Sequence, residues 1–394
     1  MNGAAGATTA DARAVAAVRR APFPVIEVAG SFRAMGEQHG RAARPLIDVA
    51  LRYYRERLER DSGLAWPSVL ELAADVRGAI AAYDADAMAE IEGIADGAGV
   101  ALDAIVALNA RTELLALAAA RAGAPGAAAA PAADASGPDE CTSAAVLPGA
   151  TADGRVLLGR NWDQNLRCLD HTLVVRARPD GARALVYLTE AGILIREGVN
   201  DAGVGVTGNL LACDRDGRGV EGMPVAVVRR RMLRAANLAD AVAEGLAAPV
   251  AHSVNHLLAD AAGGAVDLET TPGDVFQVHP EGDILVHANH FRHPDADGAL
   301  CDTAADRSPS SFLRYRRVRE QLDARRGHLG LADLQAAFRD HEGYPDSVCN
   351  HPSPDAPRPP SGSVASVAMD LTEREMWIAP HPVCENPYTR YALP

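Results

Sequence analysis

The residue with the clearest chemical potential is Cys141, in the stretch "DECTSAAVLPGATADGRVLLGRNWDQN" at 139–165. A thiol is a nucleophile only as the thiolate, so it needs a base nearby. A cysteine at a chain start can use its own α-amine, whose ordinary pKa of about 7.7–8.0 suits a base near neutral pH. Attack of the Cys141 thiol on the Glu140 carbonyl, followed by hydrolysis of the thioester, would expose that amine. The stretch therefore predicts a self-cleaving precursor, and the alternative is a buried structural cysteine at a strand start.

The segments on either side of Cys141 differ in kind. Residues 122–139, "AGAPGAAAAPAADASGPD", have no periodic apolar face and contain helix breakers, which predicts a flexible loop or an inter-domain linker. After Cys141 the pattern alternates, and two strands flank a turn at Asp153-Gly154. Cleavage would act where a loose loop joins a rigid strand.

The rest of the chain predicts an α+β protein with two sheets packed between helices. Residues 1–22 are expected to be flexible, and residues 23–27 to form a short strand. Helical periodicity covers 31–61, 66–82, 84–98, 102–121, 224–237, 238–248, 310–325 and 331–341. Strand patterns occur in 172–189, 192–211, 252–263, 265–271, 275–280, 283–291, 363–371 and 375–381.

Composition limits the partners. The chain has 394 residues, is 48% hydrophobic and carries a formal net charge of −14, so nucleic acid and anionic membranes are poor partners. Two basic stretches, "RRRMLR" (229–234) and "RYRRVRE" (314–320), are predicted to be solvated helix faces. The six cysteines show no CxxC spacing, and the start of the chain lacks a signal-peptide pattern. A reduced, cytoplasmic setting without membrane association is expected.

Several further motifs recur in one order along the chain. Together with the stretch around Cys141, they resemble the isopenicillin N acyltransferase family of self-cleaving N-terminal nucleophile hydrolases, over roughly residues 24–392, and the Ala-, Gly- and Arg-rich composition indicates a bacterial member. The motifs are "AMGEQHG" (34–40), "EIEGIADGAGVALDAIVALNARTEL" (90–114), "VNDAGVGVTGNLL" (199–211), "ILVHANHF" (284–291), "YPDSVC" (344–349) and "SVASVAMDL" (363–371). The resemblance implies a four-layer αββα sandwich. It also implies an α chain, residues 1–140, that is mainly helical over 23–140 and stays associated with a catalytic β chain, residues 141–394.

The resemblance assigns roles position by position. Cys141 matches the nucleophile, Asp163 the carboxylate that orients the freed amine, and Asn289 the oxyanion-hole amide. Arg160 and Asn209 match further positions in the related bile salt hydrolases. Strand alternation places 161 and 163 on one face and Arg160 on the other, so the alternative for Arg160 is an exposed sheet arginine.

Three features depart from the fungal enzyme of the family. Glu140 stands where that enzyme has glycine before the nucleophile. Asn350 follows Cys349 in place of an arginine, and Arg358 is the nearest arginine. The loop before Cys141 is also longer. These differences bear on cleavage and on binding of a substrate carboxylate.

The resemblance implies an acyl-enzyme at Cys141 that passes its acyl group to water or to an amine. A small specialised metabolite or an aminoacyl or peptide amide is the expected substrate, without a metal or organic cofactor. An acyl-coenzyme A or another acyl thioester is a candidate cosubstrate. The expected partners are that small molecule and the α and β chains of the same precursor, while the oligomeric state stays open.

Two other readings remain open. His287, His290 and His293 follow one another at three-residue spacing, with His279 nearby, and zinc hydrolases use such clusters to activate water. Three-residue spacing gathers ligands on a helix, however, whereas this stretch has a strand pattern. The other reading is a member of the fold that binds an acyl or peptide ligand without turning it over.

Overall fold

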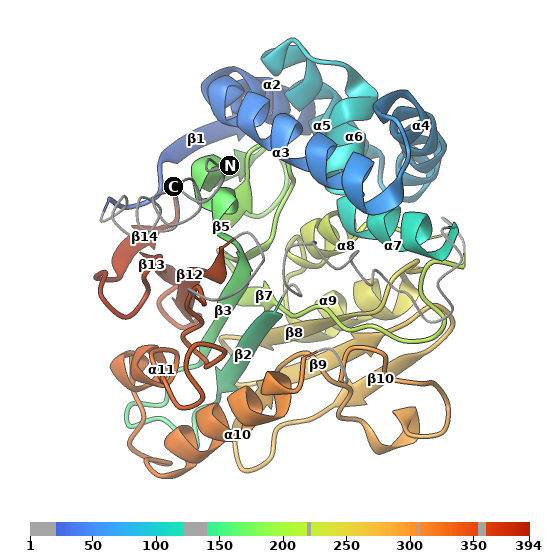
Figure 1. Cartoon of the computed structure of the whole chain (residues 1–394). Coiled ribbons are helices and arrows are strands. Elements are labelled where there is room, and N and C mark those ends of the chain that lie inside the picture. Colours follow the sequence, from blue (N-terminus) through green and yellow to red (C-terminus); the bar gives the residue numbers. More distant parts are fainter. Residues whose placement is uncertain (1–20, 122–139, 219–221, 306–307, 354–359) are drawn as a thin grey trace, which may run out of the picture.

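The computed structural model describes residues 21–121, 140–218, 222–305, 308–353 and 360–394, so the predicted loop 122–139, residue Arg358 and almost all of the predicted flexible N-terminus lie outside it. Within those residues, two β-sheets lie face to face between two groups of helices (Figure 1). The predicted four-layer αββα sandwich is confirmed.

The larger sheet has the strand order β1-β4-β5-β6-β7-β8-β9-β10 within the described residues. Its strand β1 pairs in parallel with β4, while the other neighbours are antiparallel. The chain before Cys141 therefore supplies an edge strand as well as helices. The strands are β1 (Val25–Gly30), β4 (Thr172–Pro179), β5 (Leu185–Glu190), β6 (Glu197–Asn200), β7 (Val204–Thr207), β8 (Val254–Asp260), β9 (Ala265–Thr270) and β10 (Val275–Val278).

The smaller sheet is antiparallel, with the order β11-β2-β3-β12-β13-β14. The predicted hairpin after residue 140 forms its centre as β2 and β3, and β14 was missed by the sequence patterns. The strands are β2 (Glu140–Val146), β3 (Leu157–Asn165), β11 (Ile284–His287), β12 (Ser361–Asp370), β13 (Glu375–Pro380) and β14 (Thr389–Ala392).

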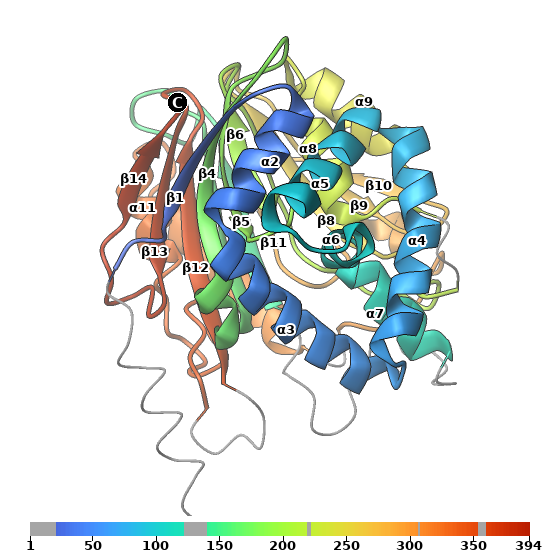
Figure 2. The ribbon, with the colours of Figure 1, turned by 90° about the horizontal axis from the view of Figure 1, so that it is seen from above.

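Helices form the two outer layers (Figure 2). The larger group lies on the eight-stranded sheet and consists of α2 (Phe32–Ala42), α3 (Arg44–Ser62), α4 (Trp66–Tyr83), α5 (Ala85–Ala98), α6 (Leu102–Asn109), α7 (Arg111–Arg121), α8 (Val225–Met232) and α9 (Leu238–Ala247). On the six-stranded sheet, α10 (Ser310–Asp323) packs against β2 and β11, and α11 (Leu331–Ala337) against β3 and β12. No helix in the described ranges has both the length and the apolar character that a bilayer crossing requires.

Two predicted helices are each divided in two. The expected helix 31–61 is divided at Ala43, and the second helix begins at Arg44 with Pro45 in its first turn, where a missing backbone N–H costs no intrahelical hydrogen bond. The expected helix 102–121 breaks at Ala110. Ser31 caps α2, because its side chain accepts a hydrogen bond from the Ala34 N–H.

Glycines bring α2 and α5 into close contact. A Cβ atom at Gly36 would lie 2.1 Å from the Glu90 carbonyl oxygen, and one at Gly93 would lie 2.2 Å from the Arg33 carbonyl oxygen. No side chain fits in either place, so the two backbones touch directly. This contact explains why the "AMGEQHG" stretch needs glycine, and it anchors the N-terminal helices to one another.

The apolar core has two layers. Facing residues of the two sheets, such as Leu158 and Val206, belong to one large cluster that continues into the N-terminal helices. A second cluster lies between the six-stranded sheet and α10–α11 and includes Val146 and Phe338. The sheet that carries Cys141 is therefore buried on both faces, which holds its side chains in fixed positions.

Candidate active site

Cys141 is the second residue of β2, and its side chain is 1% exposed. It is directly opposite Trp162 on β3, and two residues further along Ser143 is opposite Arg160. Since alternate residues of a strand share a face, Cys141, Arg160 and Trp162 all point toward the eight-stranded sheet. The strand pairing thus brings the Arg160 side chain to the thiol.

The Arg160 guanidinium contacts the Cys141 sulfur. Its Nη2 atom donates a hydrogen bond to Sγ over 2.7 Å, and its Nη1 atom lies 3.7 Å from Oε2 of Glu197 on β6. Arg160 is 3% exposed, so the alternative of an exposed sheet arginine is wrong. Arg160 does lie on the opposite face from Asp163, as strand alternation predicts, but its face is the one that the Cys141 side chain occupies.

Burial controls the Cys141 thiol in the uncleaved chain. Loss of solvent raises the pKa of Cys141, and the nearby Arg160 guanidinium offsets that rise only in part. The thiol is therefore protonated at neutral pH. A cation is in place to stabilise a thiolate, but the closed structure keeps the sulfur in its less reactive form.

Asn289 and Arg314 hold both polar atoms of the Cys141 backbone. The Cys141 N–H donates to Oδ1 of Asn289 over 2.8 Å, and the Cys141 carbonyl accepts from Nη1 of Arg314 over 2.5 Å. Arg314 Nη2 also donates to Asn289 Oδ1, at 2.9 Å. The Asn289 Nδ2 group instead donates to the Leu210 carbonyl over 2.9 Å. In the uncleaved chain Asn289 thus faces Cys141 as an acceptor, whereas an oxyanion-hole role needs a donor.

Asp163 lies on the other face of the sheet, directly opposite Glu140. Its Oδ1 atom accepts a hydrogen bond from the Ser363 hydroxyl over 2.6 Å, and Oδ2 has no hydrogen-bond partner among the described residues. Burial raises the pKa of Asp163 to about 7, against the opposing influence of Arg314. A carboxyl group with such a pKa exchanges a proton readily near neutral pH.

The Glu140 carboxylate lies among four polar side chains near the start of α10, which we call the Glu140 cradle: Ser308, Ser310, Asn350 and Arg314. Ser308 and Ser310 donate hydroxyl hydrogen bonds to its Oε1 atom, the second over 3.1 Å. Nδ2 of Asn350 donates to Oε2 over 3.4 Å, and Nη2 of Arg314 lies 3.8 Å from the same atom. Glu140 sits in a regular strand, so its backbone does not require the glycine of the fungal enzyme. Two departures from the family, Glu140 and Asn350, therefore contact each other.

Asn209 lies beside β2 but bonds its neighbour rather than Cys141. Its Nδ2 group donates to the Ser143 hydroxyl over 2.9 Å, and its N–H donates to Oδ1 of Asn255. The Asn209 side chain is 1% exposed, and its Oδ1 atom has no partner among the described residues. Asn209 therefore contacts β2 at Ser143, which is two residues along the strand from Cys141.

Arg314 is the site residue that the sequence interpretation missed. The prediction that both basic stretches are solvated is wrong, because Arg314, Arg229 and Arg230 are 0%, 4% and 0% exposed. Arg230 forms an ion pair with Glu90 at 2.8 Å, and Arg229 donates to backbone carbonyls. The signal for Arg314 was helical spacing, since it shares a buried face of α10 with Val318 and Leu322 at intervals of four residues.

The three histidines proposed as an alternative metal site do not converge. His287 contacts Oε1 of Glu269 at 2.7 Å, His290 contacts the Ser311 hydroxyl at 2.7 Å, and His293 accepts from the Asp295 N–H. Among the residues described by the structure, the groups close enough to share an ion do not include this trio. The three rings contact different partners and do not converge, so this prediction is wrong.

The match to a known family follows this geometry. Residues 150–381 match the family described as acyl-coenzyme A:6-aminopenicillanic acid acyl-transferase, more than half of the chain. The chain belongs to this family, which supports an enzyme that hydrolyses amide bonds or transfers acyl groups. The matched range includes Arg160, Asp163, Asn209 and Asn289. The range begins nine residues after Cys141, however, so the match does not include the proposed nucleophile.

Solved structures with a similar fold are distant. Penicillin V acylase from Agrobacterium tumefaciens is 12% identical, with a TM-score of 0.40, over 61% of this chain and 83% of that one. A mutant of conjugated bile acid hydrolase from Clostridium perfringens is 12% identical, with a TM-score of 0.42, over 64% and 97%. A Caenorhabditis elegans orthologue of N-acylethanolamine-hydrolyzing acid amidase is 15% identical, with a TM-score of 0.43, over 64% and 100%. Likenesses this weak bear on neither the substrate nor the site.

Proposed function

We propose that this chain is the precursor of a cysteine N-terminal nucleophile enzyme that cleaves itself before Cys141. The Cys141 sulfur adds to the Glu140 carbonyl carbon, the C–N bond breaks, and the Cys141 nitrogen takes a proton to become an amine. Water then hydrolyses the thioester, which leaves a carboxylate on Glu140 and restores the thiol. The α chain, 1–140, and the β chain, 141–394, stay associated.

The observation that carries this proposal is the set of contacts around one peptide bond. Arg160 contacts the sulfur, Asn289 accepts from the nitrogen that would leave, and Asp163 lies opposite the residue that would be released. The sulfur that would attack and the nitrogen that would leave therefore each have a polar partner. A structural cysteine in an apolar core would need none of these neighbours.

After cleavage, the freed amine of Cys141 serves as the general base for its own thiol, and Asp163 orients that amine. The sulfur attacks the carbonyl of an amide or a thioester. Asn289, once its amide group rotates to present Nδ2, and a backbone N–H stabilise the oxyanion, a contribution of about 3–4 kcal/mol in comparable sites. Asn209 is the second candidate donor.

The acyl-enzyme then passes its acyl group to water, as in an amidohydrolase, or to an amine, as in an acyltransferase. We infer a small specialised metabolite or an aminoacyl or peptide amide as the substrate, with an acyl-coenzyme A or similar thioester as the alternative acyl donor. This chemistry uses side chains, a backbone N–H and the Cys141 amine, without a metal or organic cofactor.

The proposal is tested by labelling the cleaved protein with a β-lactone acyl probe and mapping the modified peptide by mass spectrometry. We expect one acyl group on Cys141, and none on that residue in a Cys141→Ala variant. Cys301 is an exposed thiol, so Cys301→Ala controls for non-specific acylation and should leave the Cys141 label intact. A folded, cleaved protein that takes no label at Cys141 would favour the ligand-binding alternative.

A further inference from the structure

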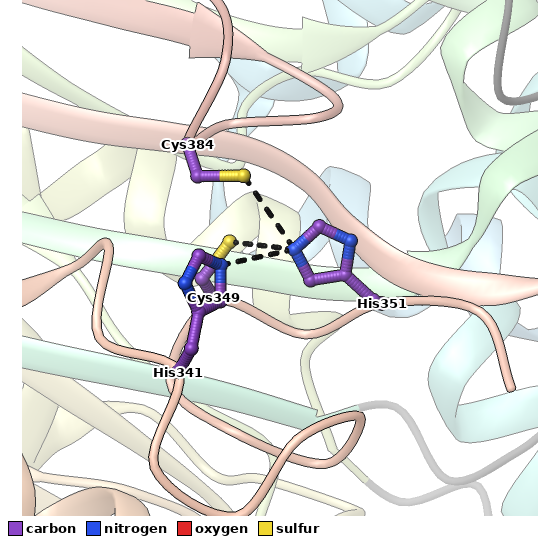
Figure 3. A group of neighbouring side chains, drawn as sticks. All are labelled: His341, Cys349, His351 and Cys384. Atoms are coloured by element: carbon purple, nitrogen blue, oxygen red, sulfur yellow. Dashed lines mark hydrogen bonds between the residues drawn. The ribbon is translucent and has the colours of Figure 1, made fainter.

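Four potential metal ligands meet outside the candidate active site: His341, Cys349, His351 and Cys384 (Figure 3). The first three lie between α11 and β12, and Cys384 lies just after β13. Each offers one ligand atom, and these atoms all lie within 4.8 Å of one another. Cys349 is buried, His351 and Cys384 are partly buried, and His341 is exposed, so the group lies at the protein surface with one side in the interior.

The distances from His351 Nε2 to the other three ligand atoms fit a tetrahedral site. The Nε2 atom of His351 lies 3.3 Å from the Cys349 sulfur, 3.5 Å from the Cys384 sulfur and 3.2 Å from the His341 Nε2 atom. A zinc ion with Zn–N bonds of about 2.0–2.1 Å and Zn–S bonds of about 2.3 Å holds neighbouring ligand atoms about 3.3–3.8 Å apart. The three distances from His351 Nε2 are therefore about the length of a tetrahedron's edges, and Figure 3 draws these three contacts as dashed lines.

The arrangement of the polar atoms also fits a cation. The Nε2 atoms of His341 and His351 face each other at 3.2 Å, with the Cys349 and Cys384 sulfurs beside His351 Nε2. Two Nε2 atoms that face each other share at most one proton between them. A divalent cation would satisfy both nitrogens and convert the thiols to thiolates, with release of their protons.

We propose that His341, Cys349, His351 and Cys384 bind one divalent cation of the zinc class in a closed structural site. Two thiolates with two imidazoles are a ligand set that zinc favours over the hard cations magnesium and calcium. With four protein ligands, no position remains for a catalytic water, which distinguishes this site from a hydrolytic metal centre. The proposal does not depend on the chemistry proposed for Cys141.

Other candidate ligands are weaker. Cys168, His171 and Glu190 also lie close together, but Glu190 already forms ion pairs with Arg111 and Arg196. Two guanidinium groups neutralise that carboxylate and would repel an added cation. In contrast, among the residues that the structure describes, no arginine forms a hydrogen bond or ion pair with the four ligand atoms of the proposed site.

The proposed metal site would connect the segment 341–351 to Cys384. It would also fix the position of the residue that lies between the ligands Cys349 and His351. Asn350 lies between Cys349 and His351, and it contacts Glu140 and accepts the Ser363 N–H at its carbonyl. Ser363 in turn donates to Asp163. If the proposed cleavage at Glu140–Cys141 is correct, the ion would hold Asn350 against the cleavage site as a positioning device.

The test is the metal content of the full chain, purified with a non-thiol reductant, loaded with Zn²⁺ and dialysed, then measured by elemental mass spectrometry. We expect one zinc per chain in the wild type and in Cys301→Ser, and a loss of most of that zinc in Cys349→Ser and in Cys384→Ser. Replacement by Co²⁺ should give the visible absorption of tetrahedral thiolate-bound cobalt. His341→Gln, at the exposed ligand, tests the site without disturbing the core and should weaken zinc binding by about 10-fold or more in chelator competition.

Wild-type protein that retains no more zinc than Cys384→Ser would overturn the proposal. So would a disulfide between Cys349 and Cys384 in wild-type protein that holds no metal. An octahedral cobalt spectrum, unchanged in the serine variants, would show adventitious binding elsewhere and would equally contradict it. These readouts measure metal alone, so they stand apart from the success or failure of self-cleavage.

Discussion

The sulfur of Cys141 and the guanidinium of Arg160 are in direct contact, with 2.7 Å between Sγ and Nη2. Arg229 lies close enough that its positive charge and that of Arg160 repel, and this repulsion, after burial, lowers the pKa of Arg229 to about 9. The sulfur therefore lies in an electropositive environment of the kind that reactive cysteines use. In the uncleaved chain, the effect of burial on the pKa of Cys141 outweighs the effect of this positive charge. The thiol is therefore unreactive because it is shielded from solvent, although a stabilising cation is in place.

Replacing Arg160 should make the thiol of the cleaved enzyme less acidic. We expect Arg160→Met to slow acylation of Cys141 near neutral pH by about 10-fold, equivalent to about 1.4 kcal/mol, because the thiolate loses its charged donor. The pH dependence of the labelling rate should shift to higher pH. Arg316→Met, at an arginine whose side chain is 56% exposed, is the matched control. An unchanged pH profile in Arg160→Met would exclude Arg160 as the activating cation.

The buried Asp163 should make folding stability depend on pH. Its pKa rises from 3.8 to about 7 on folding, so between these values the folded chain binds a proton that the unfolded chain releases. The stabilising contribution is complete below about pH 4 and is lost as the pH rises toward 7. Asp163→Asn, made in the uncleaved Cys141→Ala variant, removes this dependence, so its melting temperature relative to Cys141→Ala alone should rise across that interval. A difference that stays constant with pH would contradict the assigned pKa.

Glu140 should assist cleavage through its cradle. Glu140→Gln keeps an acceptor for Ser308 and Ser310 and should cleave within a few-fold of the wild-type rate. Glu140→Leu leaves the cradle without an acceptor and should slow cleavage by about 10-fold or more, since an unsatisfied buried polar group costs about 1–3 kcal/mol. The time course of freshly synthesised chain on a denaturing gel measures this rate. Equal rates for the two variants would show that the cradle plays no part in cleavage.

Arg314 should be far more important for stability than its neighbours on α10. It bonds the Cys141 carbonyl, the Thr142 hydroxyl and Asn289, and its side chain is fully buried. We expect Arg314→Met to lower the free energy of unfolding by about 3–5 kcal/mol, because its buried partners lose their donor. Arg316→Met, two residues away and largely exposed, should change it by about 0.5 kcal/mol or less. Denaturant unfolding of the two variants would refute the assignment if both lose the same amount.

Local patterns were enough to predict much of the fold. The alternation after Cys141 and the Asp153-Gly154 turn define the β2–β3 hairpin, and helical spacing locates most helices. The sequence patterns did not predict the helix breaks at Ala43 and Ala110, because a break of one residue barely disturbs the apolar spacing. They also did not predict the short strand β14. The layers follow from the order of the elements, whereas their exact ends depend on tertiary packing.

The candidate site was harder to predict, because its contacts join distant segments. The cross-strand register decides that Arg160, and not Asp163, shares the face of the Cys141 side chain. Arg314 reaches Cys141 from 173 positions away, and its helical spacing with Val318 and Leu322 places it on a buried face but does not identify its partner. Cys349 and Cys384 have no motif spacing, so their meeting with His351 also appears only in three dimensions.

The central claim is cleavage between Glu140 and Cys141, and the most direct measurement is the intact mass of the purified protein under denaturing conditions. We predict two chains, the second beginning at Cys141, and a single uncleaved chain for Cys141→Ala purified in parallel. Wild-type protein that remains one chain of 394 residues would contradict the account, because the Cys141 amine would not exist to act as the base.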